Sequence, residues 1–349
     1  MKKKFAVVGY GGMGGWHVNH ALKSDVLELA GIFDIDEAKC ELAKSRGIYA
    51  YSSLDELIAD ESVEIVTVAI PNDVHLETVT RLLRGGKNVV CEKPVAMCSA
   101  DLEEMIKASK ESGKLFTVHQ NRRWDVDYLA MQKIKDSGEI GKPIRIESRI
   151  HGSRGIPSDW RCHAQYGGGM MLDWGVHIID QLLLIYKDEK IDTINCVTTN
   201  ITTDEVDDGF YLTITFESGA VAFCEVGTYN FIALPRFYMK AEKGSALIRD
   251  WREKTKVAKC KYWHENDVLP VQTAAGLTKT MAPRDSVTLD EYEIDIPKSD
   301  VHDFYRNLVR AVDGKEPQIV THDQVRLVLK VMEQAFESAK LGQTVKFKY

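Results

Sequence analysis

A glycine-rich turn directly after a short apolar run is the feature that most constrains this chain. Residues 5–8 are apolar, and residues 9–14 read Gly-Tyr-Gly-Gly-Met-Gly. In a strand–turn–helix unit, Gly9 permits the tight turn, Gly11 lets the backbone approach a pyrophosphate, and Gly14 lets the helix pack on the sheet. The backbone N–H groups that open the helix then face the phosphates, so the motif predicts a dinucleotide site.

An acidic residue completes this motif at the end of the next predicted strand, residues 26–33. Asp34 lies 25 residues after Gly9, where a carboxylate accepts hydrogen bonds from the ribose hydroxyls of a dinucleotide. The same carboxylate repels a 2′-phosphate, and Ile35 rather than an arginine follows it. The sequence therefore predicts NAD as the cofactor, with NADP less favoured. The alternative is that the glycines only form a turn and that Asp34 caps the next helix.

The first 122 residues alternate short apolar runs with amphipathic helical patterns, which is typical of a Rossmann domain with a doubly wound parallel sheet. Strands are expected over residues 5–8, 26–33, 63–70, 88–91 and 115–118, and helices over residues 12–23, 73–84 and a segment that Ser99 caps. A chain of 349 residues is too long for one ordinary core, so we place a second domain at residues 123–349.

The second domain shows the patterns of an α+β fold with a mostly antiparallel, open sheet. Residues 210–216 and 220–226 alternate apolar and polar positions around a Glu-Ser-Gly turn, as a β-hairpin does. Thr321 and Gln324 form a capping box before the last helix, and residues 271–285 are expected to be a long loop. An open sheet face needs a cover, so we expect a homo-oligomer, a dimer or tetramer, formed through this sheet.

Charge and composition exclude several classes of partner. The net charge of −7 disfavours nucleic acid and anionic membranes. The N-terminal apolar run is too short for a signal peptide or a membrane span, so a cytoplasmic protein is expected. The seven cysteines are scattered without a CxxC pair, which indicates reduced thiols. Cys162 and His163 are adjacent, but no second pair of ligands accompanies them, so we expect no metal.

Three further segments carry polar residues at positions where this fold would bind a ligand. Residues 69–75, Ala-Ile-Pro-Asn-Asp-Val-His, follow the third strand, and residues 91–94, Cys-Glu-Lys-Pro, follow the fourth. Residues 167–177, Gly-Gly-Gly-Met-Met-Leu-Asp-Trp-Gly-Val-His, open a helix that is expected over residues 170–186. Ligands bind outside the carboxyl ends of parallel strands, so the first two segments are expected beside the cofactor.

With these motifs the sequence closely resembles the Gfo/Idh/MocA oxidoreductase family, which includes inositol dehydrogenases and glucose–fructose oxidoreductase. The glycine fingerprint, Pro-Asn-x-x-His, Glu-Lys-Pro and Gly-Gly-x-x-x-Asp-x-Gly-x-His occur in the family's order and cover essentially the whole chain. The resemblance implies that Lys93, Asp173 and His177 form the catalytic set and that a cis bond precedes Pro94. Residues 119–125, His-Gln-Asn-Arg-Arg-Trp-Asp, also look like members near scyllo-inositol dehydrogenase.

The chemistry of these three residues suits hydride transfer. Asp173 and His177 are spaced i and i+4, so on an α-helix they share a face, and Lys93 comes from the other domain. Alcohol oxidation needs a base for the O–H proton, and histidine has a suitable pKa. We expect His177 to accept the proton and Lys93 to stabilise the substrate oxygen, or the two to exchange or share these roles. Asp173 would bind substrate hydroxyls or tune its neighbours.

The residues expected to contact the cofactor lie in the glycine turn and after the strands: Gly9, Gly11, Gly12, Met13, Gly14, Asp34, Ile35, Ile70, Pro71, Asn72, His75, Glu92, Lys93 and Asn121. Glu92 is placed either beside the nicotinamide or behind Lys93. The residues expected to contact substrate mix cations with indoles, which suits a small polyhydroxylated ligand: Arg122, Trp124, Arg154, Trp160, Arg161 and His163. For each of these six, an exposed loop position or a subunit contact is the alternative.

The sequence therefore predicts a metal-free, NAD(P)-dependent dehydrogenase acting on CH–OH groups. It would move a hydride between nicotinamide and a carbinol or carbonyl carbon of a sugar, glycoside or inositol-type substrate. One alternative is a reductase of non-sugar carbonyls or dihydrodiols. Another is a catalytically silent NAD-binding regulator on the same fold, which would be expected to lack Lys93 or His177, although both are present.

Overall fold

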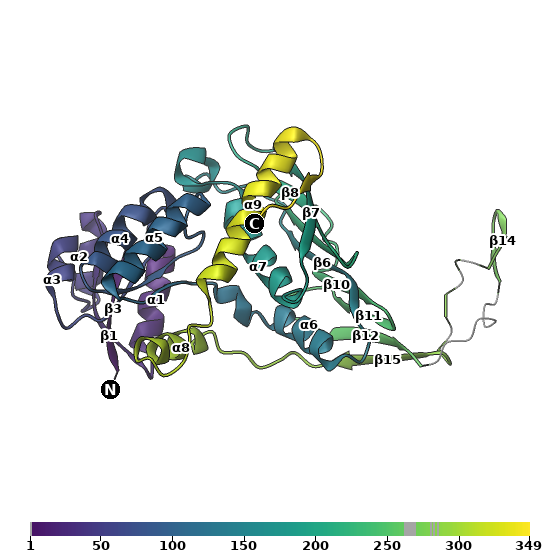
Figure 1. Cartoon of the computed structure of the whole chain (residues 1–349), viewed down its shortest axis with the longest axis horizontal. Helices are drawn as coiled ribbons and strands as arrows, with labels where there is room; N and C mark the ends of the chain where they lie inside the picture. The colour runs from purple at the N-terminus through teal and green to yellow at the C-terminus, as the bar shows by residue number, and fades with distance from the viewer. Residues whose placement is uncertain (1, 262–269, 280, 282, 285) are drawn as a thin grey trace.

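The computed structural model describes residues 2–261, 270–279, 281, 283–284 and 286–349. These residues form two large sheets with helices between them (Figure 1). No helix in this described part of the chain is long and apolar enough to cross a membrane.

The N-terminal sheet is five-stranded and parallel, in the order β2-β1-β3-β4-β5. Its strands are β1 (Lys3–Val8), β2 (Leu27–Phe33), β3 (Ile65–Val68), β4 (Asn88–Cys91) and β5 (Phe116–Val118). The helices between and after them are α1 (Gly12–Leu22), α2 (Glu37–Ser45), α3 (Leu54–Ala59), α4 (His75–Arg84) and α5 (Ser99–Ser112). Strand β3 is buried at every position, as a parallel sheet covered on both faces requires. The predicted Rossmann domain is confirmed.

The cap of α5 differs from the prediction. The sequence predicts that Ser99 caps α5, but Ser99 is its first helical residue, and Cys98 holds the cap position without a side-chain hydrogen bond. The Ser99 N–H donates to Glu333 Oε1 of the last helix at 2.7 Å. A carboxylate from far along the chain therefore takes the capping role, which a local pattern does not reveal.

The C-terminal sheet has nine strands in the order β15-β12-β11-β10-β6-β9-β8-β7-β16. All neighbours are antiparallel except β6 and β9. The strands are β6 (Pro143–His151), β7 (Ile191–Thr199), β8 (Gly209–Phe216), β9 (Val221–Gly227), β10 (Phe237–Ala241), β11 (Gly244–Ile248), β12 (Thr255–Cys260), β15 (Leu289–Ile294) and β16 (Val345–Lys346). This arrangement confirms the predicted mostly antiparallel α+β half.

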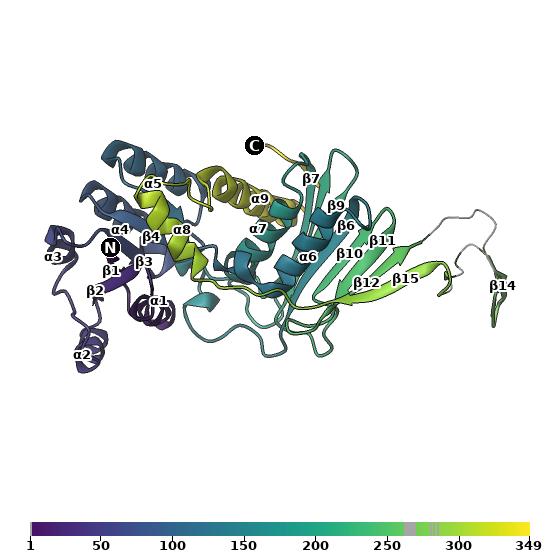
Figure 2. The same cartoon turned by 90° about the horizontal axis from the view of Figure 1, so that it is seen from below.

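Helices cover one face of the large sheet (Figure 2): α6 (Val126–Ser137), α7 (Val176–Ile185) and α9 (His322–Leu341). Strand β8 buries Phe210, Leu212 and Ile214 toward them, whereas Tyr211 is exposed. The alternation in the sequence therefore separates a covered face from an open one. The predicted capping box at the start of α9 is confirmed, because the Thr321 side chain accepts from the Gln324 N–H.

The prediction of one long loop over residues 271–285 is wrong for its described part. Strands β13 (Val271–Thr273) and β14 (Gly276–Thr278) pair as a small hairpin that projects far from the body of the molecule (Figure 1). Neither strand buries a residue, so the sequence carries no apolar alternation to indicate them. Residues 280, 282 and 285 lie outside the described part.

A helix from the end of the chain packs on the N-terminal half. Helix α8 (Asp303–Val312) places the Tyr305 ring edge-on to Phe5 of β1, with ring centroids 6.2 Å apart. Arg306 pairs with Asp25 at 3.1 Å. A helix that follows most of the second domain in sequence therefore packs against the Rossmann sheet.

Candidate active site

A buried ion pair joins the two halves at the end of β4. Lys93 follows this strand, and the peptide bond between it and Pro94 is cis. The Lys93 Nζ donates to Asp173 Oδ1 at 2.9 Å and to the Asp173 carbonyl oxygen at 3.0 Å. Their side chains are only 15% and 13% exposed. The predicted meeting of a lysine from one half with an aspartate from the other is present in the structure.

The turn that carries Asp173 is not the α-helix that the sequence predicts over residues 170–186. Residues Met171–Gly175 form a π-helical turn, and regular α-helix begins only at Val176. Asp207 binds the start of this turn, because its carbonyl oxygen accepts from the Met170 N–H at 2.9 Å and its Oδ2 from the Met171 N–H at 2.8 Å. Wide turns of this kind are common at functional sites.

The Asp173 carboxylate lies between two cations. Its second oxygen accepts from the Arg161 Nε at 3.2 Å. Burial alone would raise the pKa of Asp173, but the charges and hydrogen bonds of Lys93 and Arg161 outweigh burial and hold that pKa below its usual value. Asp173 is therefore a fixed anion that orients both cations.

His177 is a buried, neutral imidazole near this ion pair. Burial lowers the pKa of His177 well below its usual value, and the positive charges of Lys93 and Arg122 lower it further. Its Nδ1 is buried and has no hydrogen-bond partner among the described residues. A neutral imidazole with an unpaired nitrogen can accept a proton.

An aromatic and guanidinium cluster lies beside His177. The Trp174 ring is edge-on to His177, with centroids 6.1 Å apart. The Arg122 guanidinium is 4.1 Å from the Trp174 ring centroid and 5.5 Å from that of Trp251. Both indoles are partly exposed. The sequence identifies Arg122 but not the indoles, because Trp251 lies in an unpatterned segment after β11.

The glycine turn has the close approaches that a dinucleotide site requires. Gly9 has φ of +89°, and a Cβ there would lie 2.3 Å from the Ala69 carbonyl oxygen. A Cβ on Gly14 would lie 1.8 Å from the Gly9 carbonyl oxygen, whereas Gly11 and Gly12 face open space. The tight positions hold the turn against the sheet, and the open positions leave the helix start accessible to phosphate. These residues fit a dinucleotide.

The acidic residue that follows β2 lies beside the glycine turn. The Asp34 carboxylate accepts from the Tyr10 N–H at 2.6 Å and the Asp36 N–H at 2.9 Å, which fixes it beside the glycines. Asp36, not Asp34, is the N-cap of α2, so the alternative of Asp34 as that cap is wrong. Ile35 and Met13 are exposed beside this turn.

Two side chains of the segment after β3 contact backbone carbonyl oxygens of neighbouring loops. His75 is fully buried, and its two ring nitrogens lie 3.0 Å from the Ile70 carbonyl oxygen and 3.2 Å from that of Val95. The expected direct contact of His75 with the cofactor is therefore replaced by a role in holding two strand-end loops together. Asn72 donates to the Gly167 carbonyl oxygen at 3.2 Å, while Pro71 is exposed.

Glu92 belongs to a buried polar cluster. Its Oε1 lies 2.7 Å from His17 Nε2 and 2.8 Å from His119 Nδ1. These three side chains are the one group among the described residues with the make-up of a metal site. Two nitrogen or oxygen ligands of a tetrahedral zinc ion lie roughly 3.3 Å apart, given bonds of about 2.0 Å. The observed distances are those of hydrogen bonds, so the residues do not fit a bound metal.

The predicted substrate residues separate into two groups. Arg161 donates to Asp173 of the ion pair and stacks on Trp160 with 4.5 Å to the ring centroid, while Arg122 lies over the ring of Trp174. Trp124 instead packs on Phe304 of α8, so its expected substrate contact is replaced by core packing. The others lie on the exposed loop: His163 pairs with Glu205 at 3.2 Å, and Arg154 is exposed.

Comparison with known sequences and structures identifies the family of this chain. The sequence model of the oxidoreductase family with an NAD-binding Rossmann fold matches residues 3–120, and that of the Gfo/Idh/MocA C-terminal domain matches residues 128–247. The chain belongs to the Gfo/Idh/MocA oxidoreductase family. A crystal structure of an NAD-binding protein from Listeria innocua is 42% identical, with a TM-score of 0.93, and each chain covers 99% of the other.

Curated relatives in the family are more distant or matched over less of their length. An uncharacterized oxidoreductase of Schizosaccharomyces pombe is 37% identical over 150 residues, which is 41% of each chain. The chain thus spans well under half of this relative. A scyllo-inositol 2-dehydrogenase (NADP(+)) of Bacillus subtilis is 26% identical over 98% of this chain and 95% of its own. The predicted family and NAD-binding fold are confirmed.

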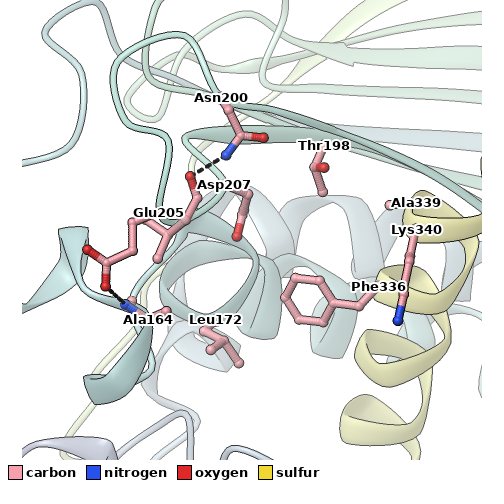
Figure 3. A pocket seen from close by; sticks show the side chains of 11 residues that line it. Ala164, Leu172, Thr198, Asn200, Glu205, Asp207, Phe336, Ala339 and Lys340 are labelled. Atoms are coloured by element: carbon pink, nitrogen blue, oxygen red, sulfur yellow. Dashed lines mark hydrogen bonds between the residues drawn. The ribbon is translucent and has the colours of Figure 1, made fainter.

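A cavity of about 410 Å³ lies beside the Met171–Gly175 turn of this family member (Figure 3). Leu172 of the turn and Asp207 line it, together with Phe336 and Lys340 of α9. Burial raises the pKa of Asp207 to about 7. Lys93, Asp173 and His177 are not among its lining residues, so the cavity is separate from the candidate active site.

Sequence reasoning missed four buried residues that support this site: His17, His119, Asp207 and Tyr305. Their partners are 27 to 288 positions away, as for His17 with Tyr305 and His119 with Glu92. The available signals were the histidine that opens residues 119–125 and the histidine in α1, three residues after the last glycine of the fingerprint. On a helix, that position faces the sheet and the strand ends.

Proposed function

We propose that this protein is an NAD-dependent dehydrogenase that moves a hydride between nicotinamide and a carbinol or carbonyl carbon of a sugar, glycoside or inositol-type substrate. The observation that carries the proposal is the meeting of Lys93, Asp173 and His177 where the two halves join. The Lys93 Nζ is 2.9 Å from Asp173, and its charge acts on the pKa of His177.

Each residue has a role that follows from its state. His177 is neutral, so it takes the hydroxyl proton as the C–H hydride leaves the substrate carbon. The Lys93 ammonium stabilises the developing alkoxide or carbonyl oxygen. Asp173 keeps Lys93 in place and binds a neighbouring hydroxyl. Bound NAD supplies the hydride acceptor, held at the Gly9–Gly14 turn.

A polyhydroxylated substrate is supported by the groups around the ion pair. Arg161 donates to Asp173, and the partly exposed Trp174 and Trp251 flank Arg122. Cations and indoles together bind hydroxyls and the apolar face of a ring. The relative named scyllo-inositol 2-dehydrogenase, which matches nearly the whole chain, acts on such a molecule. A reductase of non-sugar carbonyls or dihydrodiols is the second candidate, and substrate profiling separates the two.

The preference for NAD over NADP rests on Asp34. Its carboxylate is fixed beside the glycine turn by two backbone N–H groups, where it favours ribose hydroxyls and repels a 2′-phosphate. The Bacillus subtilis relative is named for NADP, so dissociation constants for both cofactors are a direct test. A lower constant for NADP would overturn the role of Asp34.

We also propose that the protein is cytoplasmic and forms a homo-oligomer through the open face of its large sheet. Partly apolar residues on that face, including Val197 and Tyr211, are exposed. Sedimentation of the wild-type chain and of a Tyr211→Glu variant tests this role, and a monomeric wild-type chain would overturn it.

The catalytic assignment is tested by NADH formation across a panel of inositols, sugars and glycosides. Lys93→Ala and His177→Ala are each expected to lower kcat by roughly 10²- to 10⁴-fold while NAD still binds. Lys107→Ala is the matched control, because this lysine is 60% exposed on α5. Near-wild-type turnover in both active-site variants would overturn the catalytic assignment. No turnover by the wild type with any substrate of the panel, although NAD binds, would support the alternative of a silent NAD-binding regulator.

A further inference from the structure

Four buried side chains from distant parts of the chain form one hydrogen-bonded cluster behind Lys93. His17 comes from α1, Glu92 from the end of β4, His119 from the end of β5, and Tyr305 from α8. Glu92 Oε1 meets both histidines, and its Oε2 accepts from the Lys93 N–H at 3.1 Å. The Tyr305 hydroxyl lies 2.6 Å from His17 Nδ1.

The positions of the protons in this cluster follow from its geometry. Tyr305 donates to His17 Nδ1, so His17 Nε2 carries the proton that it donates to Glu92. His119 donates from Nδ1, and its buried Nε2 has no partner within the described residues. Glu92 thus receives three N–H groups and gives none, which a carboxylate can do and a carboxylic acid cannot do fully.

The electrostatics agree with this assignment. Burial lowers the pKa of His17 to about 4, despite its hydrogen bond to Glu92. Burial by itself would raise the pKa of Glu92, but His119 and His17 outweigh it and hold that pKa well below the usual value. Glu92 is therefore a permanent anion with at least one neutral histidine beside it.

The topology places this anion under the nicotinamide half of the cofactor. Asp34 follows β2 and marks the adenosine side, and the glycine turn follows β1 and marks the pyrophosphate. The sheet order continues from β1 to β3 and β4, so the nicotinamide half extends over the ends of those strands. Glu92 directly follows β4, and its charge also reaches His177.

The nicotinamide ring is a cation in NAD⁺ and neutral in NADH, because it gains a hydride with its electron pair. We propose that Glu92 is a fixed counter-charge for this ring, and that it makes the protein bind NAD⁺ more tightly relative to NADH than a protein without this anion would. The consequence is that the equilibrium between bound NAD⁺ and bound NADH is shifted toward NAD⁺. The hydride transfer on the protein is therefore shifted toward the alcohol rather than the carbonyl compound. This inference depends on NAD binding, but not on the substrate or on the roles of Lys93 and His177.

Equilibrium binding tests the inference without turnover. Dissociation constants for NAD⁺ and NADH are measured by calorimetry for the wild type, Glu92→Gln and Glu92→Asp. Glu92→Gln is expected to raise the ratio of the NAD⁺ constant to the NADH constant about tenfold, the order expected for one charge several ångströms away. Glu92→Asp keeps the charge and is expected to keep the ratio, even if both affinities fall.

Two further measurements separate charge from structure. Tyr305→Phe removes the hydrogen bond to His17 and is expected to lower Tm without changing the ratio. For the wild type, the benzamide analogue of NAD⁺, which has a neutral ring of the same shape, is expected to bind about tenfold more weakly than NAD⁺. This comparison stands even if Glu92→Gln does not fold. Equal affinities for the two rings, or a ratio unchanged in Glu92→Gln, would overturn the proposal.

Discussion

The two halves of this molecule build their parts of the site by different means. At its glycine turn, the nucleotide-binding half relies on its main chain, because Gly9 and Gly14 bring backbone atoms together within six residues. The other half relies on side chains whose partners are distant in sequence, because the Asp207 carboxylate accepts from the Met171 N–H, 36 positions away. A short motif can therefore specify the first half, whereas the second depends on the completed fold.

The largest test of this contrast concerns a second buried ion pair, between Arg123 in the segment after β5 and Asp180 of α7. Arg123 and Asp180 form two hydrogen bonds of 2.8 and 2.6 Å, and both side chains are buried. Asp180→Ala leaves the guanidinium buried without its counter-charge, so the free energy of unfolding is expected to fall by about 3–5 kcal/mol in urea titrations. Asp55→Ala, which breaks an exposed pair with Arg81, is the control and should cost less than about 1 kcal/mol.

Equal losses of stability in these two variants would show that the fold does not depend on the buried pair of Arg123 and Asp180. The proposed dependence of the C-terminal half on buried side chains would then be wrong.

A matched pair of glycines tests the main-chain half. Gly14→Ala places a Cβ 1.8 Å from the Gly9 carbonyl oxygen, so it is expected to cost about 1–3 kcal/mol of stability and to weaken NAD binding. Gly15→Ala has no atom within 4 Å of the new Cβ and lies in the same helix. Gly15→Ala is expected to raise the free energy of unfolding by at most about 1 kcal/mol. Thermal unfolding measures the stability of both variants, and calorimetry measures their affinity for NAD. Wild-type stability and affinity in Gly14→Ala would contradict the close approach of Gly14 to Gly9.

The side-chain half should also show a pH dependence through Asp207. Burial raises its pKa from 3.8 to about 7. Between these values the folded protein binds a proton that the unfolded chain has lost, so stability falls as pH rises, by up to about 1 kcal/mol per pH unit. Asp207→Asn keeps an acceptor for the Met171 N–H and should remove this slope. Tm from pH 4 to 8 measures it; identical slopes in variant and wild type would contradict the assignment.

The smallest expected effect concerns Arg122 and His177. The Arg122 charge helps to lower the pKa of His177, after burial and Lys93. Arg122→Gln is therefore expected to raise the pKa of His177 by less than about one unit, and NMR titration of the imidazole measures this shift. Arg84→Gln, on the exposed end of α4, should leave it unchanged. A fall in the pKa of His177 in Arg122→Gln would show that the Arg122 charge does not lower this pKa.

The sequence predicts the Rossmann half well because its signals are local. The run of residues 5–8 and the glycines adjoin in sequence, and Asp34 follows the next apolar run, so short windows of sequence show the strand, the turn and the acid. The site is only partly predictable: the motifs name Lys93, Asp173 and His177, but the π-helical turn at Met171–Gly175 depends on Asp207, which lies 36 positions beyond Met171. Trp251 and Tyr305 gain their places through contacts that form only when distant segments meet.

The return of α8 to the N-terminal sheet affects how the protein matures during synthesis. Tyr305 covers Phe5 and supplies the donor to His17, yet it is made after nearly nine-tenths of the chain has been translated. A nascent chain in which only the glycine turn has left the ribosome therefore lacks the helix that packs beneath its nucleotide site. The dinucleotide is then expected to bind stably only late in synthesis, once nearly the whole chain has been translated.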